Sequence, residues 1–356
     1  MKKILLIFLL AFVLAPVQAQ DDELDLLFEQ AANGDIEAQK IIGATYIQDG
    51  DYEMGVRWTL KAAKQGDAEA EYNMGFCYFK GLGVEQDYPQ AVAWFLKAAE
   101  GGIVDAQYNL AVCYDNGLGV AQDYKEAVKW YTKAAKQGDA DAQFHLASCY
   151  ENGDGVKQSY SDAAKWYRKA AEQGDVDAQY KLGVFYNQGK GVSADFDESI
   201  GWFVKAAKNG DAESQYIISQ CFEEGITYPS YDDYYEEWVE LEAVPKDLQA
   251  AVYWCRKAAL GGHAKAQSKM GYYYYTGTGL PINFTQAFFW FYKAAEQGDA
   301  FAQFTVGNCY LKGHGVEKDK KQAQLWLERA LYNEKDVLEA EFKESAKFLL
   351  KQLRGF

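Results

Sequence analysis

Apolar residues recur along this chain with helical spacing, in short runs separated by glycine-containing breaks. In the stretch 103–138, Leu110 and Tyr114 belong to one apolar face, and Trp130 and Ala134 belong to a second. Paired glycines lie between the two faces and interrupt the helical pattern. The stretch therefore predicts two amphipathic helices joined by a short loop.

The same pattern repeats along most of the chain. The glycines that end the second helix, Gly66, Gly102, Gly138, Gly174 and Gly210, are each 36 residues apart, and Gly262 and Gly298 continue the series. A single helix pair cannot bury both apolar faces, whereas stacked pairs share one continuous core. The sequence therefore predicts eight units, at residues 35–66, 67–102, 103–138, 139–174, 175–210, 211–262, 263–298 and 299–334.

Capping signals support these boundaries. Asp123 and Glu126 form a capping-box pattern, in which each side chain can satisfy a backbone N–H of the new helix. The pattern recurs at Asp87/Gln90, Asp195/Glu198, Asn283/Gln286 and Asp319/Gln322. Because an open end of a stack exposes its core, capping helices are expected at residues 20–34 and at residues 335–356.

The repeated residues resemble a known family. Met74-Gly75, Tyr78 and Gly81-Leu82-Gly83-Val84 show the first half of its pattern, and Leu182-Gly183, Tyr186 and Gly189-Lys190-Gly191-Val192 show it again. With the Asp-x-x-x-Ala-x-x-Trp-x-x-Lys-Ala-Ala that follows, the pattern is similar to the Sel-one-like repeat, a relative of the tetratricopeptide repeat. The resemblance implies an all-α fold, a right-handed α/α solenoid of stacked two-helix repeats. It also implies an adaptor or scaffold role rather than one particular chemistry.

The N-terminal segment predicts export. Lys2 and Lys3 precede an apolar run from Ile4 to Leu14, and Val17-Gln18-Ala19 has the small residues of a cleavage site. Residues 1–19 therefore predict the signal peptide of a bacterial protein that is periplasmic or secreted. The run is too short for a membrane span, and no other stretch reaches the roughly 20 apolar residues that a span needs.

Charge and histidine content narrow the function classes. The formal net charge of −16 favours solubility, disfavours nucleic acid and anionic membranes, and leaves a basic protein as a suitable partner. The three histidines, His145, His263 and His314, lie in different units and have no ligands at metal-binding spacing. The sequence predicts neither a metal site nor a cofactor.

Cysteines and tryptophans follow the repeat. Cys77, Cys113, Cys149, Cys221 and Cys309 share one first-helix position. Equivalent positions in stacked units lie about 10 Å apart, beyond the roughly 7 Å that a disulfide allows between Cα atoms, so buried free thiols are predicted. Cysteine-rich exported members of the family carry two cysteines per repeat that bridge its two helices, which leaves a Cys221–Cys255 bridge as the alternative. Eight of the nine tryptophans share one second-helix position and are predicted to be core residues.

The unit 211–262 is 16 residues longer than the others. The excess is an insertion at 229–244, rich in acids and aromatic residues, and the candidate partner-binding residues within it are Tyr231, Tyr234, Tyr235 and Trp238. Tyr234, Trp238 and Leu241 have the spacing of a short amphipathic helix. Insertions in solenoids often lie on the binding face, and local packing against the scaffold is the alternative.

Some first-helix positions differ from unit to unit and lie off the apolar face, so they are free to carry specificity. The candidates at these positions are Asn73, Phe76, Asn109, Val112, His145, Ser148, Lys181 and Val184, and Tyr108 flanks them as core or groove wall. By resemblance to tetratricopeptide solenoids, the first helices line the concave surface. Asparagine amides there can both donate to and accept from a peptide backbone, and a merely solvated stripe is the alternative.

The sequence predicts an exported, monomeric scaffold or adaptor that binds a protein or peptide on its concave face and is not an enzyme. One alternative is a cell-wall-ligand binder or a penicillin-binding, β-lactamase-like enzyme, since some exported family members have been linked to penicillin binding. The chain has no Ser-x-x-Lys motif for that chemistry. The other alternative is a secreted factor that engages host proteins.

Overall fold

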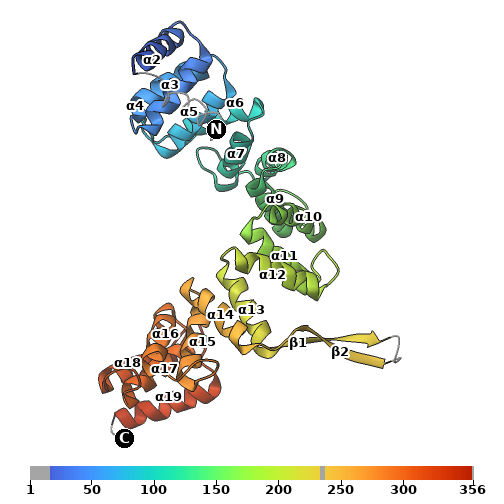
Figure 1. Ribbon diagram of the computed structural model, residues 1–356, viewed down its shortest axis with the longest axis vertical. Helices are drawn as coiled ribbons and strands as arrows, with labels where there is room; N and C mark the ends of the chain where they lie inside the picture. Colours follow the sequence, from blue (N-terminus) through green and yellow to red (C-terminus); the bar gives the residue numbers. More distant parts are fainter. Residues whose placement is uncertain (1–16, 233–236, 355–356) are drawn as a thin grey trace. The chain divides into compact units, whose positions relative to one another are not determined.

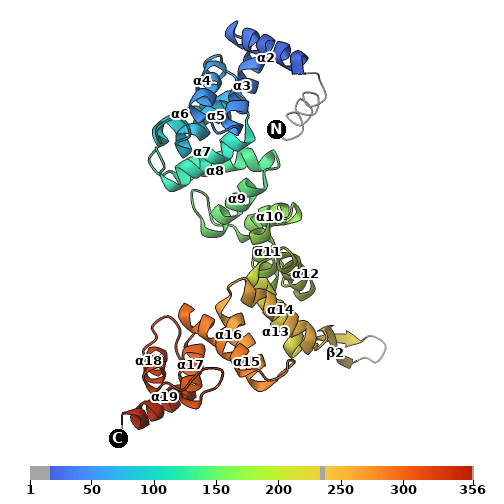
Figure 2. The ribbon, with the colours of Figure 1, turned by 60° about the vertical axis from the view of Figure 1, so that its left-hand side comes forward.

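The computed structural model describes residues 17–232 and 237–354, and the side chains of 24–225 and 245–354. The chain forms two compact units, residues 1–173 and residues 174–356. Each unit is a row of helices in which every helix packs on the next one along the chain (Figures 1 and 2). Residues 1–16 of the predicted signal peptide lie outside the described residues.

The first unit begins with a single helix and continues with helix pairs. Its described helices are α2 (Val17–Ala32), α3 (Ile36–Gln48), α4 (Tyr52–Lys64), α5 (Ala68–Lys80), α6 (Tyr88–Glu100), α7 (Val104–Asn116), α8 (Tyr124–Lys136), α9 (Ala140–Asn152) and α10 (Tyr160–Glu172). Odd-numbered labels from α3 mark the first helix of a repeat, and even-numbered labels mark the second.

The second unit continues the pattern. It contains α11 (Val176–Gln188), α12 (Phe196–Lys208), α13 (Ala212–Glu224), α14 (Leu248–Leu260), α15 (Ala264–Thr276), α16 (Phe284–Gln297), α17 (Ala300–Lys312), α18 (Lys320–Leu331) and α19 (Ala340–Leu353). Between α13 and α14 lie two strands, β1 (Ile226–Asp232) and β2 (Glu237–Val244). The predicted all-α repeat solenoid is confirmed, with this strand pair as a local addition.

Local sequence explains where the helices begin and end. The Asp67 carboxylate accepts a hydrogen bond from the Ala70 N–H at 2.8 Å at the start of α5, and Gly81 ends that helix in the left-handed region at φ 71°. Asp87 caps α6 in the same way, at 3.0 Å from Gln90 N. These contacts satisfy backbone groups that a helix terminus leaves without partners.

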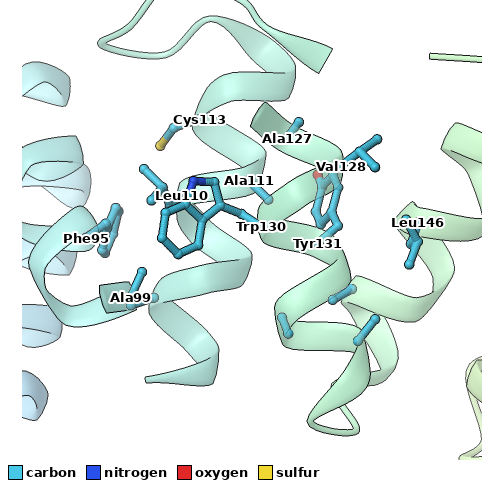
Figure 3. Close-up of a cluster of buried hydrophobic side chains, with 14 of the residues drawn as sticks. Phe95, Ala99, Leu110, Ala111, Cys113, Ala127, Val128, Trp130, Tyr131 and Leu146 are labelled. Carbon is cyan, nitrogen blue, oxygen red and sulfur yellow. The ribbon is translucent and has the colours of Figure 1, made fainter. Parts of the chain in front are cut away.

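Side chains from consecutive helices merge into shared clusters. Figure 3 shows one of them, in which α6, α7, α8 and α9 meet and Leu110, Tyr131 and Leu146 are buried. Of the in-phase tryptophans, Trp130, Trp202, Trp290 and Trp326 are buried, whereas Trp58, Trp94, Trp166 and Trp254 are only half-buried. The prediction of tryptophan core positions therefore holds for four of them, and the other four form the edge of the core.

All six cysteines are buried and unbridged in the structure, Cys221 and Cys255 included. Burial raises the pKa of Cys77 to about 11 and that of Cys113 to about 12. A thiol that stays protonated at neutral pH is a poor nucleophile. The cysteines therefore act as small apolar core residues.

At one contact between neighbouring repeats, the large and the small side chain are exchanged in the second unit. Tyr131 of α8 shares a core cluster with Cys149 of α9, and its hydroxyl donates to Asp115 Oδ2 at 3.2 Å. At the equivalent positions, α14 carries Cys255 and α15 carries Tyr273, again in one core cluster. The large and the small side chain have changed places across the interface between the two repeats.

The insertion forms a β-hairpin, so the predicted amphipathic helix is wrong. β1 and β2 pair antiparallel, with Tyr231 opposite Trp238 and Tyr228 opposite Leu241. Aromatic and β-branched residues favour strands, and one isolated helical turn or two is unstable in water. In both views the strands extend away from α13 and α14 (Figures 1 and 2).

The hairpin does not change the hydrogen bond that closes the loop between the two helices of its repeat. In the regular repeats the N–H of the second-helix cap donates to a carbonyl near the end of the first helix, as Asp123 N does to Tyr114 O at 2.9 Å. Asp247 N makes the equivalent bond to Phe222 O at 2.8 Å across the insertion. Both flanking helices keep the common length of 13 residues.

A buried glutamine near the start of the first helices links consecutive repeats. Gln143 Nε2 donates to Ala135 O at 3.0 Å, and Gln143 Oε1 accepts from Gln173 Nε2 at 2.8 Å. The glutamines at this position are Gln39, Gln107, Gln143, Gln179, Gln215, Gln267 and Gln303. Glu71 occupies it in α5 and is buried. An ionised carboxylate has no proton to donate to the preceding carbonyl, so this link is incomplete at neutral pH.

Replacement of Glu71 by Gln is expected to stabilise the protein at pH 7 by about 1 kcal/mol. Burial raises the pKa of Glu71, and the nearby Lys97 offsets this only in part. A raised pKa in the folded state means that the contribution of this group is present below pH 4.5 and is lost as the pH rises through the folded-state value. The advantage of Glu71→Gln should therefore shrink when urea unfolding is repeated at acidic pH.

Glu69 supplies the matched control for that experiment. Its carboxylate is exposed and lies 2.6 Å from Lys40 Nζ, so Glu69→Gln should give no gain at pH 7. Equal or lower stability of Glu71→Gln relative to the parent at pH 7 would show that the carboxylate is well accommodated.

Candidate partner-binding face

The proposed first-helix residues lie at the surface in both units. We call Asn73, Phe76, Tyr108, Asn109, Val112, His145, Ser148, Lys181 and Val184 the first-helix face. Phe76 is 38% exposed and the others are half-buried. None of these residues is in the buried core, so the positions are accessible to a partner. The first seven belong to the first unit, and the last two belong to the second.

In the first unit, Tyr72 of α5 lies between two side chains of this face. Asn109 Nδ2 lies 3.5 Å from the Tyr72 hydroxyl, and the Tyr72 ring centroid is 6.4 Å from that of Phe76. Tyr108 and Val112 also pack partly against the core beneath them. The face is therefore a packed surface of aromatic rings and amides, with positions fixed by the core.

His145 is held by aromatic rings. Its ring stacks on Tyr131 with centroids 5.3 Å apart and an angle of 5°, and it also contacts Tyr108 and Phe144 at 5.8 and 5.6 Å. These contacts fix the imidazole against α7 and α8. The residue thus contributes an ordered ring to the face.

In the second unit the equivalent positions carry more charge. Lys181 and Val184 of α11 are half-buried, and Val184 packs against a core cluster. Lys269, at the position of Asn73, forms an ion pair with Glu223 at 2.8 Å. Sequence analysis did not identify Glu223, because it faces Lys269 from a neighbouring repeat.

Of the four candidates in the insertion, Tyr231 and Trp238 are paired across the hairpin. Tyr234 and Tyr235 lie outside the described residues. The first-helix face and the hairpin are thus separate candidate regions.

Two further properties bear on function. Between residues 17 and 354, leaving out 233–236, the histidine, cysteine and acidic side chains form no cluster of three or more that could hold a metal ion. In the same part of the chain no helix combines the length and apolar character of a membrane span.

Comparison with known proteins identifies the repeat. The model of the Sel1 repeat matches residues 43–67, 68–103, 104–139, 140–175, 176–211, 240–263, 264–299 and 300–333. A search of curated proteins gave no significant match.

Two solved structures are similar over nearly the whole chain. One is a protective antigen present in uropathogenic Escherichia coli strains and displaying an SLR fold, 27% identical, with 92% of this chain and 86% of that chain covered and a TM-score of 0.69. The other is a Sel1 repeat protein from Oxalobacter formigenes, 30% identical, with 91% and 89% covered and a TM-score of 0.68. The repeated matches and these structures together show that the chain belongs to the Sel1 repeat family.

Proposed function

We propose that this protein is an exported scaffold or adaptor that binds a protein or peptide across its first-helix face. Sel1 repeat proteins generally mediate protein–protein interactions. The observation that carries the proposal is the first-helix face itself. Most of its residues differ from repeat to repeat, all of them stay out of the buried core, and Tyr108 and His145 contact each other between neighbouring repeats.

The chemistry of the face suits an extended peptide. Asn73 and Asn109 offer amides that can pair with a peptide backbone, and ordered rings such as His145 offer flat apolar contact. Acids on the first helices, such as Asp105 and Asp141, add negative potential. A basic partner is therefore expected, with binding that weakens as salt concentration rises.

Export rests on the N-terminal sequence pattern. The similarity to a protective antigen agrees with it, because an antigen must be accessible to antibodies. We propose a periplasmic or secreted monomer. Fractionation of producing cells tests the location, and a cytoplasmic protein that retains Met1 would contradict it.

The protein is proposed to have no catalytic activity of its own. Sel1 repeat scaffold proteins are typically non-enzymatic. The cysteine thiols are buried and have raised pKa values, which removes one class of nucleophile. Stoichiometric acylation by a labelled penicillin would favour the enzyme alternative instead.

Affinity capture with matched variants tests the binding face. The double variant Asn73→Ala/Asn109→Ala should lose a partner captured by the parent, with at least about a tenfold fall in affinity. Lys129→Ala, an exposed change on second helix α8, is the control and should keep the partner. Loss in both variants, or in neither, would contradict the assignment of the first-helix face.

The hairpin is expected to be dispensable for folding and to contribute to partner choice. Residues 226–246 can be replaced by Leu-Gly-Val-Ala-Gln, the loop found at 118–122. Because Asp247 and Phe222 still close the loop, and loop length changes closure entropy by only about 0.6 kcal/mol per doubling, the melting temperature should stay within a few degrees. Partner affinity should fall about tenfold or more.

The two readouts of the loop replacement separate the alternatives. A large fall in melting temperature would show that the insertion packs against the scaffold and stabilises the fold. Unchanged affinity for the captured partner would show that the hairpin takes no part in binding.

A further inference from the structure

The second helices of the last three repeats carry exposed apolar residues that lie outside the first-helix face. Tyr253 of α14, Phe289 of α16 and Leu325 of α18 occupy equivalent positions and are 52%, 45% and 41% exposed. We call these three residues the apolar row. The same position carries other residue types in the preceding repeats, Arg57, Ala93, Lys129, Lys165 and Gly201. The repeat fold thus does not require an apolar residue here.

Two more exposed apolar residues lie at the ends of these helices. Leu260 is the last residue of α14 and follows Tyr253 by two helical turns, and Tyr332 comes directly after the last residue of α18. They are 72% and 73% exposed. Large apolar side chains that recur on one surface mark interaction sites more often than single exposed residues do.

The three second helices form one surface. Trp290 of α16 lies in the same core cluster as Val252 of α14. Tyr292 of α16 contacts Trp326 of α18 with ring centroids 5.4 Å apart. Equivalent positions in stacked repeats lie about a helix diameter, roughly 10 Å, apart, so the row spans roughly 20 Å from α14 to α18.

Basic side chains border the row. Lys257 Nζ lies 5.1 Å from the Tyr253 ring centroid, and Lys293 Nζ lies 5.0 Å from that of Phe289. Arg329 follows Leu325 by one helical turn. In the whole of α14, α16 and α18 there are six lysines and arginines and two glutamates. The net charge of the chain is −16, so these three helices have the opposite sign from the protein as a whole.

We propose that the apolar row is a second docking surface, which binds an acidic amphipathic helix of a partner protein. A helix of about 18 residues is about 27 Å long and can cross all three second helices. Its apolar side chains would contact the row, and its carboxylates would pair with Lys257, Lys293 and Arg329. This surface is separate from the first-helix face, so its occupancy does not depend on the function proposed above.

Charge favours such a helix over an anionic membrane. A bilayer presents a wide negative surface, and the net charge of −16 disfavours its approach to the protein. A short helix faces only the locally basic surface.

Fluorescence anisotropy with the full chain tests the proposal. The probe is a labelled synthetic helix of about 18 residues with leucines on one face and glutamates elsewhere. The test variant is Phe289→Lys, which introduces the residue type already tolerated at Lys129 and Lys165. We expect it to weaken binding at least tenfold and to leave the melting temperature near that of the parent. Ala93→Lys adds the same charge at the equivalent position of the first unit and should change neither quantity.

Several results would overturn the proposal. Equal affinity of the parent and Phe289→Lys would show that the peptide binds elsewhere. Equal binding of a probe with lysine in place of each glutamate would show that charge plays no part. Phe289-dependent sedimentation with phosphatidylglycerol vesicles, or Phe289-dependent self-association, in the absence of peptide binding would identify a membrane or a second copy as the occupant.

Discussion

Gly155→Ala is expected to destabilise the first unit by about 3 kcal/mol, well above the effect of most single substitutions. Gly155 is the second glycine of the loop between α9 and α10, at φ 69°. A methyl group at this position would meet the carbonyl group of Tyr124 in the preceding repeat and would lie 2.8 Å from Lys125 N. Backbone atoms cannot move aside without displacing the start of α8. The substitution should therefore loosen the contact between two repeats as well as strain one loop.

Gly138→Ala separates the steric contact from the backbone conformation. Gly138 has φ 102°, and a methyl group there meets no atom within 4 Å. Its cost should be limited to about 1–2 kcal/mol for the left-handed conformation. Urea unfolding followed by a fluorescence signal from the first unit measures both variants. Equal destabilisation of the two would show that the close approach to Tyr124 has little energetic importance.

The exchange of Cys255 and Tyr273 should show strong coupling. Tyr273→Cys alone removes a side chain that is 0% exposed and should cost about 3–5 kcal/mol. Cys255→Tyr alone inserts a ring into a filled core and should cost about 1–3 kcal/mol. The double variant restores the arrangement of Tyr131 and Cys149, so most of the loss should be recovered.

A carboxylate is available to accept a hydrogen bond from the tyrosine in the exchanged arrangement. Asp115 accepts from the Tyr131 hydroxyl, and Glu223 is the equivalent residue in the repeat that carries Cys255. Burial, followed by the nearby Glu223, raises the pKa of Tyr273 well above its usual range. A tyrosine at 255 would therefore again have a carboxylate within its own repeat.

A double-mutant cycle measures the coupling by urea unfolding of the parent, the two single variants and the double variant. A coupling energy of at least about 2 kcal/mol is expected. The reverse exchange, Tyr131→Cys with Cys149→Tyr in the first unit, should behave in the same way. Additive losses would show that the two side chains do not share one space.

Much of the fold follows from sequence periodicity. Equivalent residues recur at a fixed interval, so one helix pair determines the expectation for the others. The cap at Asp87 and the glycine ends of the helices are local signals, and they are predictable for that reason. The in-phase position of Cys113 and its equivalents likewise predicted burial before any contact was known.

Sequence periodicity does not predict the contacts between repeats. The exchange of Cys255 and Tyr273 involves residues of different repeats, and neither residue alone indicates the other. The insertion has no equivalent in the other repeats, and the apolar spacing within it predicts a helix. The pairing of Tyr231 with Trp238 depends on a turn and a register that helical spacing does not describe.

The first-helix face was predictable only in part. Its positions were identified because they vary among repeats, and the structure places them at the surface. The packing of His145 against three rings, and the ion pair between Lys269 and Glu223, arise from side chains of neighbouring helices. Variation along a sequence indicates which positions are free to differ, and only the stacked structure shows which of them already have partners.

Site-specific photo-crosslinking tests the central claim most directly, which is that the first-helix face binds a protein or peptide. A photoreactive phenylalanine analogue is placed at position 76 or 112 of the face, or at the exposed position 93 of α6 as control. We predict that positions 76 and 112 give the same partner adduct, and that excess unlabelled parent protein or the Asn73→Ala/Asn109→Ala change removes it. An adduct from position 93 with none from 76 and 112 would contradict the account.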